Sequence, residues 1–245
     1  MTNRALKRAM KAHMAKCKKG ETLAPMNMKS NVWGPAARTN AYRILKKHGK
    51  SGTSASAIRA FLFPLPKYRI QHDYKAVHHS GNVAKGTKKV IVIHSMEVDA
   101  PNTAAEAVGS YFSRASSGGS TQFGIDNNSI QQYLSPTAVA WGAPGCNTQG
   151  IHIEQMGKAS WSTTKWKTYA KGTIDRCAWL VAKLSIDFNI PIDHLSVSEL
   201  KAGKRGVVTH YDCTKAFGGS HTDPGPHYPL NYMLEKAKMY KKNMS

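Results

Sequence analysis

Short apolar runs and amphipathic stretches alternate along the chain from residue 90 onward. The run Val90 to Ile93 is unbroken, so it predicts a strand that is buried on both faces. Further strands are predicted at 122–126, 129–134, 137–141, 150–154 and 207–209. Helical periodicity predicts helices at about 103–114, 163–188, 195–201 and 230–241. Together these elements indicate an α/β domain.

Local signals place the ends of several elements. Thr103 followed by Glu106 predicts a capping box at the start of a helix. The pair Asn127-Asn128 between two apolar runs predicts the turn of a hairpin. The long predicted helix ends just before Pro191, because proline cannot continue a helix.

Residues 1–60 differ from the rest of the chain. They are rich in Lys and Arg and contain a single acidic residue, Glu21. The stretch 3–18 predicts a basic amphipathic helix, which either packs on a second helix at 38–47 or binds a wall polymer or membrane surface. A Gly/Ser-rich linker follows, so we expect a small basic helical module at 1–60 and a separate domain at 66–245.

The formal net charge of +21 on 245 residues implies an anionic partner. Nucleic acid, anionic lipid and acidic wall polymers would all satisfy it. No helix-turn-helix or RNA-binding aromatic signature is visible, so we expect no specific nucleic acid. The four cysteines are scattered, which favours reduced thiols. The basic N-terminus has no apolar signal-peptide core, and no apolar run is long enough to span a bilayer.

Polar side chains that could bind a metal follow two of the predicted strands. His94 comes directly after the strand at 90–93, and His210 ends the strand at 207–209. Asp223 lies in a loop, rich in glycine and polar residues, that follows His210. Two imidazoles and a carboxylate would make the three protein ligands of a catalytic zinc site. Alternatively, His94 is a structural histidine of the core.

A carboxylate that could act as the base ends another predicted strand. Glu154 would then lie beside the ligands, where a zinc hydrolase needs a group that accepts a proton from water. The alternative is an ordinary exposed glutamate on an edge strand.

Four segments in this order and at this spacing resemble a known family. They are residues 91–94, 150–154, 207–210 and 221–226, the last reading His-Thr-Asp-Pro-Gly-Pro. The chain is similar, over about residues 66–245, to the zinc-dependent type 2 N-acetylmuramoyl-L-alanine amidases. That family includes many phage endolysins and the peptidoglycan recognition proteins.

The resemblance implies a fold, a metal site and a reaction. The fold would be a mixed central β-sheet flanked by helices. Zn²⁺ would be held by His94, His210 and Asp223, Glu154 would be the catalytic glutamate, and His221 would replace the lysine that stabilises the oxyanion. The substrate would be peptidoglycan, cleaved between N-acetylmuramic acid and L-alanine of the stem peptide. A phage enzyme of this kind is made in the host cytoplasm and reaches the wall through a holin. We expect it to act as a monomer.

The chain also departs from the family pattern. His152 stands where the family often has glycine, and Gly142 lies in a Trp-Gly-Ala segment where the family often has Trp-His-Ala. Residues 120–123 read Ser-Thr-Gln-Phe in place of Ser-x-His-Tyr. Some relatives use a cysteine as the third ligand, so Cys213 is an alternative to Asp223.

Two other functions remain open at this point. A peptidoglycan-binding module without activity would share the fold, although such modules typically lack a zinc ligand. A basic nucleic-acid-binding protein with structural histidines would explain the charge alone. If His221 stabilises the oxyanion, activity should fall on the alkaline side earlier than in a lysine-bearing relative, because imidazole loses its charge near neutral pH.

Overall fold

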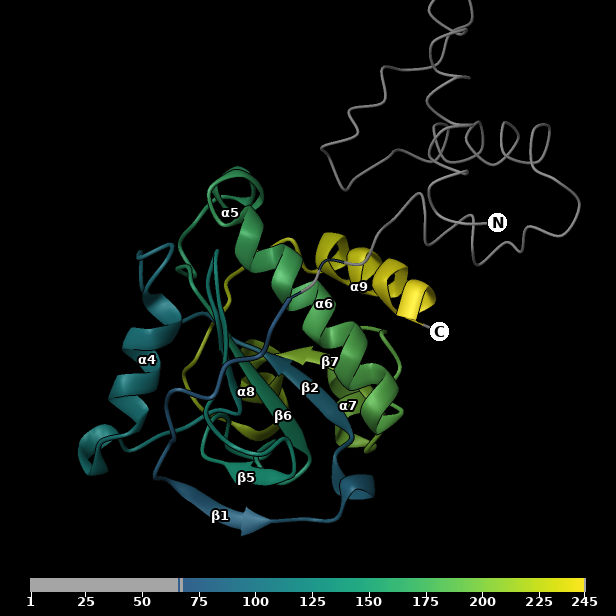
Figure 1. Cartoon of the computed structure of the whole chain (residues 1–245). Coiled ribbons are helices and arrows are strands. Elements are labelled where there is room, and N and C mark those ends of the chain that lie inside the picture. The colour runs from purple at the N-terminus through teal and green to yellow at the C-terminus, as the bar shows by residue number, and fades with distance from the viewer. Residues whose placement is uncertain (1–65, 67, 245) are drawn as a thin grey trace, which may run out of the picture. The chain divides into compact units, whose positions relative to one another are not determined.

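A computed structural model describes residue 66 and residues 68–244 of the chain (Figure 1). The chain divides into two units, Met1–Pro66 and Lys67–Ser245, and the fold described below is that of the second. The basic helical module expected at 1–60 lies outside the described residues. None of the described helices is long and apolar enough to cross a membrane.

A five-stranded mixed sheet forms the centre of the domain, in the order β4-β3-β6-β2-β7. Its strands are β2 (Val90–Ile93), β3 (Phe123–Ile125), β4 (Ile130–Gln132), β6 (Gly150–Gln155) and β7 (Gly206–Thr209). The edge strand β4 runs antiparallel to β3, and the other four strands are parallel to one another. A second, two-stranded sheet pairs β1 (His79–Asn82) with β5 (Ala138–Ala140). The predicted mixed sheet is confirmed.

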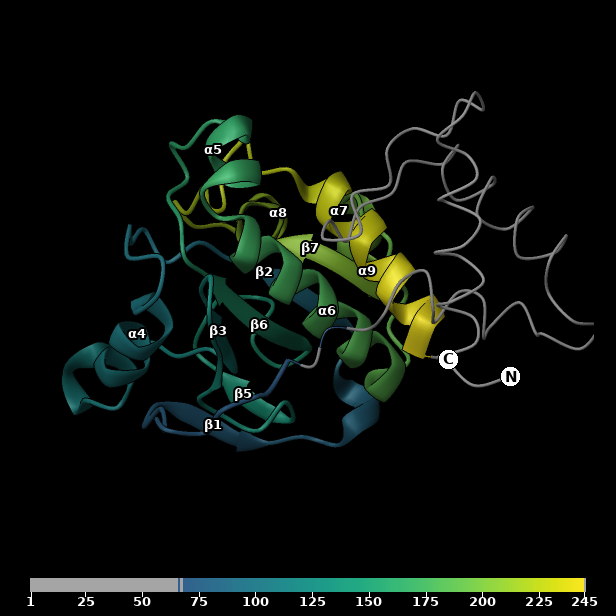
Figure 2. The same ribbon diagram turned by 45° about the horizontal axis from the view of Figure 1, so that its top comes forward.

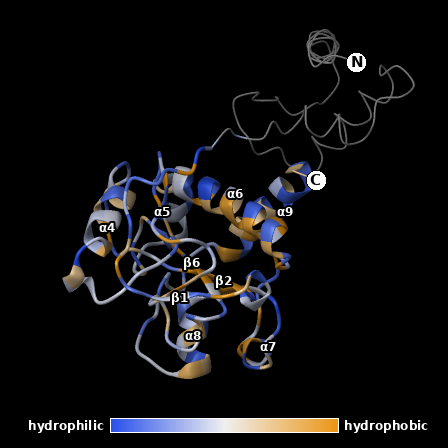
Figure 3. Ribbon diagram, turned by 60° about the horizontal axis from the view of Figure 1, so that its bottom comes forward, coloured by the Kyte–Doolittle hydropathy of each residue, from blue (hydrophilic) through white to orange (hydrophobic). Residues whose placement is uncertain are grey.

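Helices cover both faces of this sheet (Figures 1 and 2). They are α4 (Ala104–Phe112), α5 (Thr163–Thr168), α6 (Lys171–Phe188), α7 (Val197–Lys201), α8 (His210–Phe217) and α9 (Leu230–Met244). Two short 3₁₀ helices occupy Lys85–Thr87 and Ala115–Ser117. Helices α6 and α9 lie side by side, and hydrophobic and hydrophilic residues alternate along both (Figure 3). Each therefore has one apolar face to bury.

The two faces of the central strands bury different clusters. Ile91 and Ile93 of β2 belong to the main core, together with buried residues of α6 and α9. Val90 and Val92 point the other way and join a smaller core with residues of α7 and α8. Because side chains alternate along a strand, residues beyond the carboxyl end of β2 continue this alternation. His94 therefore lies on the α7/α8 side, at the exit of a strand fixed on both faces.

Several predicted boundaries need correction. The helix predicted at 163–188 is two helices, α5 and α6, which are separated at residues 169–170. Thr103 is the N-cap residue of α4, but its side chain makes no capping hydrogen bond. Glu106 instead accepts a hydrogen bond from the side chain of Gln131, so the predicted capping box is wrong. The hairpin turn at Asn127-Asn128 is confirmed by the pairing of β3 with β4.

The segment after His210 also differs from the prediction. We expected a loop there, whereas residues 210–217 form α8. Thr209 caps this helix: its hydroxyl accepts a hydrogen bond from the backbone N–H of Asp212, and Asp212 accepts one from the backbone N–H of Thr209. This reciprocal pair fixes the first turn of α8, and with it the position of His210.

Candidate metal centre and active site

The carboxyl ends of two neighbouring strands bring the first two candidate ligands together. Strands β2 and β7 are parallel, with Ile93 opposite Thr209. His94 and His210 each follow these paired residues directly, so both imidazoles emerge at the same edge of the sheet. Asp223 comes from the segment beyond α8, and the backbone N–H of Tyr211 donates to its carbonyl. That bond ties the segment back to the start of α8.

The three side chains converge on one point. Nδ1 of His94 lies 3.0 Å from Nδ1 of His210 and 3.3 Å from Oδ2 of Asp223. Nδ1 of His210 lies 3.0 Å from Oδ1 of Asp223. All three residues are buried. In the part of the chain that the structure describes, they form the one group of His, Cys, Asp or Glu residues arranged to hold a metal ion.

The spacing of these atoms suits a tetrahedral zinc site. Bonds of about 2.0–2.1 Å at tetrahedral angles place neighbouring ligand atoms roughly 3.3–3.4 Å apart. The observed separations of 3.0–3.3 Å are close to that value. Two imidazole nitrogens and one carboxylate oxygen are also a donor set that zinc accepts, and three protein ligands leave a fourth position for water or substrate. The cluster thus fits a catalytic rather than a structural zinc site.

The charges around Asp223 favour its ionised form. Burial raises the pKa of a carboxyl, but the hydrogen bonds from His210 and His94 outweigh burial and hold the pKa of Asp223 far below its usual range. Burial lowers the pKa of His94, an effect that Asp223 only partly offsets. The cluster is therefore built around a carboxylate anion with an imidazole on either side.

Glu154 lies next to this cluster, on β6. Its Oε1 atom is 4.0 Å from Nδ1 of His94, and its side chain is only 16% exposed. Burial, and then the nearby charges of Asp223 and Glu97, raise the pKa of Glu154 well above its usual range. Its buried Oε2 atom has no hydrogen-bond partner among the described residues. This carboxyl group can therefore hold a proton and has an oxygen free to exchange it.

His221 stands at the outer side of the cluster. Its ring stacks on that of His210, with centroids 4.2 Å apart and planes 16° from parallel. Its Nδ1 atom is 3.6 Å from Oδ1 of Asp223, and 63% of its side chain is exposed. All five predicted site residues thus lie in one place: three around a point, one carboxyl beside them, and one imidazole facing solvent.

Comparison with protein families identifies the chain. The model of the N-acetylmuramoyl-L-alanine amidase family matches residues 76–226. The chain belongs to this family. It is an enzyme, a hydrolase that cleaves the amide bond between N-acetylmuramic acid and L-alanine in peptidoglycan. The matched range contains every member of the cluster described above.

Several solved structures resemble this chain, and the first of them shows the same fold. The hydrolase AmiA from Staphylococcus aureus, in complex with its ligand, is 19% identical, covers 79% of this chain and 92% of its own, and superposes with a TM-score of 0.56. A mutant endolysin from Bacillus subtilis is 20% identical, with coverages of 73% and 99% and a TM-score of 0.46. The amidase LysC from Clostridium intestinale is 17% identical, with coverages of 71% and 99% and a TM-score of 0.44. No match was found among curated proteins.

Cys213, the alternative ligand, is not part of the cluster formed by His94, His210 and Asp223. It lies one turn after His210 in α8 and packs in the smaller core beside Val90 and Val92. A hydrogen bond to Cys146, and then burial, raise the pKa of the Cys213 thiol. Since a cysteine binds metal as a thiolate, this environment disfavours ligation.

Two contributors to the site were not predicted from sequence. Asp212 fixes the first turn of α8 and also binds the side chain of His194, at 2.8 Å. His152 on β6 places its Nδ1 atom 3.0 Å from Nε2 of His94. The signal for His152 was present, because a residue two positions before Glu154 on a strand faces the same side. Burial, and then the neighbouring His94 and Lys88, lower the pKa of His152 well below its usual range.

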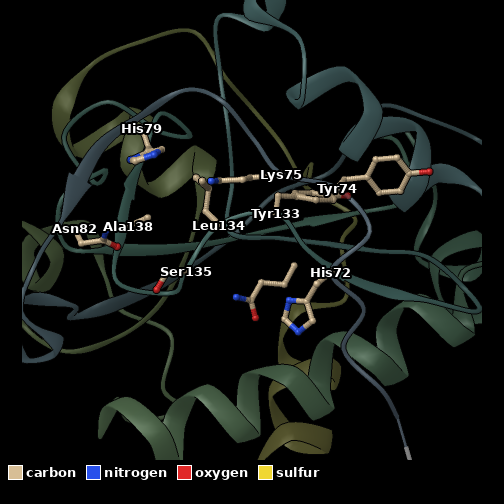
Figure 4. Close-up of a pocket in the computed structure, with 10 residues that line it drawn as sticks. His72, Tyr74, Lys75, His79, Asn82, Tyr133, Leu134, Ser135 and Ala138 are labelled. Atoms are coloured by element: carbon tan, nitrogen blue, oxygen red, sulfur yellow. The ribbon is translucent and has the colours of Figure 1, made fainter.

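A pocket of about 430 Å³ opens elsewhere in the domain (Figure 4). Its polar lining includes His72, Lys75, His79 and Ser135, and Tyr74 lies at one side. His79 is exposed, whereas the preceding His78 is partly buried, with its Nε2 atom 2.8 Å from the carbonyl oxygen of Ala115. None of the five residues of the candidate site lines this pocket, so the two features are separate.

Proposed function

We propose that the amidase is zinc-dependent and that His94, His210 and Asp223 hold the metal. The observation that carries this proposal is the convergence of three buried donor atoms at separations that suit tetrahedral zinc. When bound, Zn²⁺ supplies Lewis acidity, which makes an amide carbonyl more electrophilic and a water molecule more acidic. The three side chains fix the place where substrate and water meet.

Glu154 acts as general base and then as general acid. Its carboxylate accepts a proton from the attacking water and passes it to the amine of L-alanine as the amide bond breaks. The raised pKa of Glu154 suits this role. A base that must also release its proton works best when its pKa lies near the pH at which the enzyme operates. The unpartnered Oε2 atom gives the proton a place to reside.

His221 stabilises the oxyanion that forms on the carbonyl as water adds. Stacking on His210 holds its ring at the edge of the cluster, while its exposure leaves the ring accessible to substrate. A charged imidazole in this place favours the transition state over the uncharged ground state.

Digestion of purified peptidoglycan tests this proposal. The enzyme should release new L-alanine amino groups without new reducing sugar ends. A chelator should stop the release, and added zinc should restore it. Cleavage that survives complete removal of metal would contradict zinc dependence. Binding without cleavage by zinc-loaded protein would instead support a peptidoglycan-binding module.

We also propose that the enzyme is a phage endolysin. This rests on the sequence resemblance to a family that contains many endolysins. In that setting the protein is made in the host cytoplasm and acts on the wall after holin-type release. Expression in a bacterial cytoplasm should then lyse cells only when a pore-forming holin is co-expressed. Lysis without a holin would contradict this route.

We propose that the basic segment 1–60 binds anionic wall polymers. Its support is the excess of Lys and Arg over the single Glu21. Binding of the full chain to wall fragments should weaken steeply with salt. Removing the anionic polymers from the fragments should weaken it likewise. Equal binding to stripped and intact walls would argue against this role.

A further inference from the structure

His152 is a fully buried imidazole without a place in the proposed mechanism. It lies on β6 opposite Val92 of β2, so it faces the same side of the sheet as His94, two residues beyond Val92. Its Nδ1 atom is 3.0 Å from Nε2 of His94, and the two rings are tilted by 41°. The contact is a hydrogen bond between two side chains that water does not reach.

The direction of this hydrogen bond follows from the other nitrogen of His94. Nδ1 of His94 lies beside His210 and Asp223, on the side of the candidate metal. An imidazole that binds a metal through Nδ1 carries its proton on Nε2. Nε2 of His94 must then donate, and Nδ1 of His152 must accept. The proton of the His152 imidazole is therefore on its own Nε2.

Two glycines make room for the imidazole of His152. A Cβ atom at Gly142 would lie 2.7 Å from Nδ1 of His152, and one at Gly150 would lie 2.6 Å from Nε2. Real side chains do not approach so closely, so a larger residue at position 142 would collide with this ring. The ring occupies the space that a side chain from position 142 would otherwise use.

The backbone around His152 is also held in place. Its N–H donates to Oε1 of Gln122 at 2.6 Å, and Nε2 of Gln122 donates to the carbonyl of Ala138. The buried ammonium of Lys88 donates to the carbonyls of Gly150 and Ala138. These bonds fix β6 at the point where the imidazole leaves it, so the acceptor is preorganised.

We infer that His152 is a positioning residue: its Nδ1 accepts a hydrogen bond from Nε2–H of His94, and this keeps Nδ1 of His94 unprotonated and oriented for the metal. The family pattern often places histidine at the position of Gly142 and glycine at that of His152. In this chain the imidazole of His152, which leaves β6, occupies the space that a side chain at position 142 would use. This inference rests on the proposed zinc site.

Zinc affinity, measured by competition with a chromogenic chelator, is the first test. His152→Leu keeps an apolar side chain in the space but removes the acceptor, and should weaken zinc binding about 10- to 100-fold. His152→Gln offers an oxygen acceptor and should bind zinc more tightly than the leucine variant. Leu180→Ala, in the core on the other side of the sheet, is the control. It should lower stability and leave zinc affinity unchanged.

A reciprocal exchange is the sharper test. Gly142→His alone should disturb the site, because its Cβ would collide with His152. The double variant G142H/H152G should recover zinc affinity towards wild type, since the new imidazole enters the vacated space. If the double variant binds zinc no better than Gly142→His or His152→Gly alone, the idea that one imidazole can replace the other in this space is overturned.

Nitrogen-15 NMR of the imidazoles gives a readout that does not depend on activity. Zinc-loaded wild type should show a protected Nε2–H for His94, and the leucine variant should lose that protection. Unchanged zinc affinity and an unchanged His94 signal in His152→Leu would overturn the inference. If wild type binds no zinc at this cluster, the proposed zinc site fails first, and the two failures are thereby distinguished.

Discussion

Nδ1 of His94 lies 3.0 Å from Nδ1 of His210. Each of these ring nitrogens also lies within 3.3 Å of an oxygen of the Asp223 carboxylate. The arrangement gathers three lone-pair donors in a buried place. A shared cation would satisfy all three at once, and this supports the proposed metal site.

Removing one ligand should abolish both metal binding and catalysis. His94→Ala or Asp223→Ala should lose stoichiometric zinc, and amine release should fall to the background rate. Asp193→Ala removes a carboxylate from an exposed position and is the charge-matched control. Zinc content and amine release should both be measured. If Asp223→Ala retains activity, Asp223 is not the third ligand, and Cys213 becomes the candidate.

Glu154→Gln should separate metal binding from chemistry. The amide has nearly the same shape as the carboxyl group but cannot accept and deliver a proton. We expect kcat to fall about 10²- to 10⁴-fold, with zinc content unchanged. Rates at saturating substrate, together with zinc analysis, check this. A variant that loses zinc as well as activity would show that Glu154 supports the metal site instead.

His221 should be replaceable by lysine but not by alanine. Loss of an oxyanion-stabilising group lowers kcat by about 10²- to 10³-fold, so His221→Ala should show a loss of that order. His221→Lys should retain activity and extend it to more alkaline pH, because lysine keeps its charge there. Initial rates from pH 6 to 10 test both variants. A wild-type profile that stays flat to about pH 9 would contradict a charged His221.

Protonation of Asp212 should make the domain less stable in acid. Burial would raise its pKa, but hydrogen bonds from His194 and Thr209 hold the pKa at about 2, against 3.8 for a free aspartate. The stabilisation is present above about pH 4 and is lost as the pH falls towards 2. It amounts to about 2 kcal/mol in the free energy of unfolding.

Urea unfolding of metal-free protein checks this value. Asp212→Asn should be less stable than wild type near pH 6, and the difference should shrink towards zero near pH 2. The zinc ligands titrate in both proteins, so their contribution cancels in the difference. A difference that does not change with pH would show that Asp212 acts only through the shape of the helix cap.

The sequence predicted the parts of the fold whose pattern is local. The unbroken apolar run at 90–93 predicted a buried strand, which β2 confirms, and parallel pairing then brings the residues that follow such strands together. His94 and His210 were predictable for that reason. Helix α8 was not, because its start depends on a reciprocal bond between Thr209 and Asp212 in a segment rich in loop-forming residues.

The role of His152 could be recognised only from the three-dimensional structure. In the sequence it is a departure from a family pattern, and Gly142 is another, ten positions earlier. Only the fold shows that the imidazole of one fills the space left by the other. The alternation along β6 predicts that His152 and Glu154 lie on one face of the sheet. That His152 lies opposite Val92 of β2, and so near His94, is known only from the register of the two strands.

Diffraction from crystals of zinc-loaded protein, recorded at the zinc absorption edge, tests the central claim most directly. The account predicts one strong anomalous peak within about 2.0–2.2 Å of nitrogen atoms of His94 and His210 and of a carboxylate oxygen of Asp223. A peak on Cys213, or no peak at this cluster in a protein that still releases L-alanine amines, would contradict it.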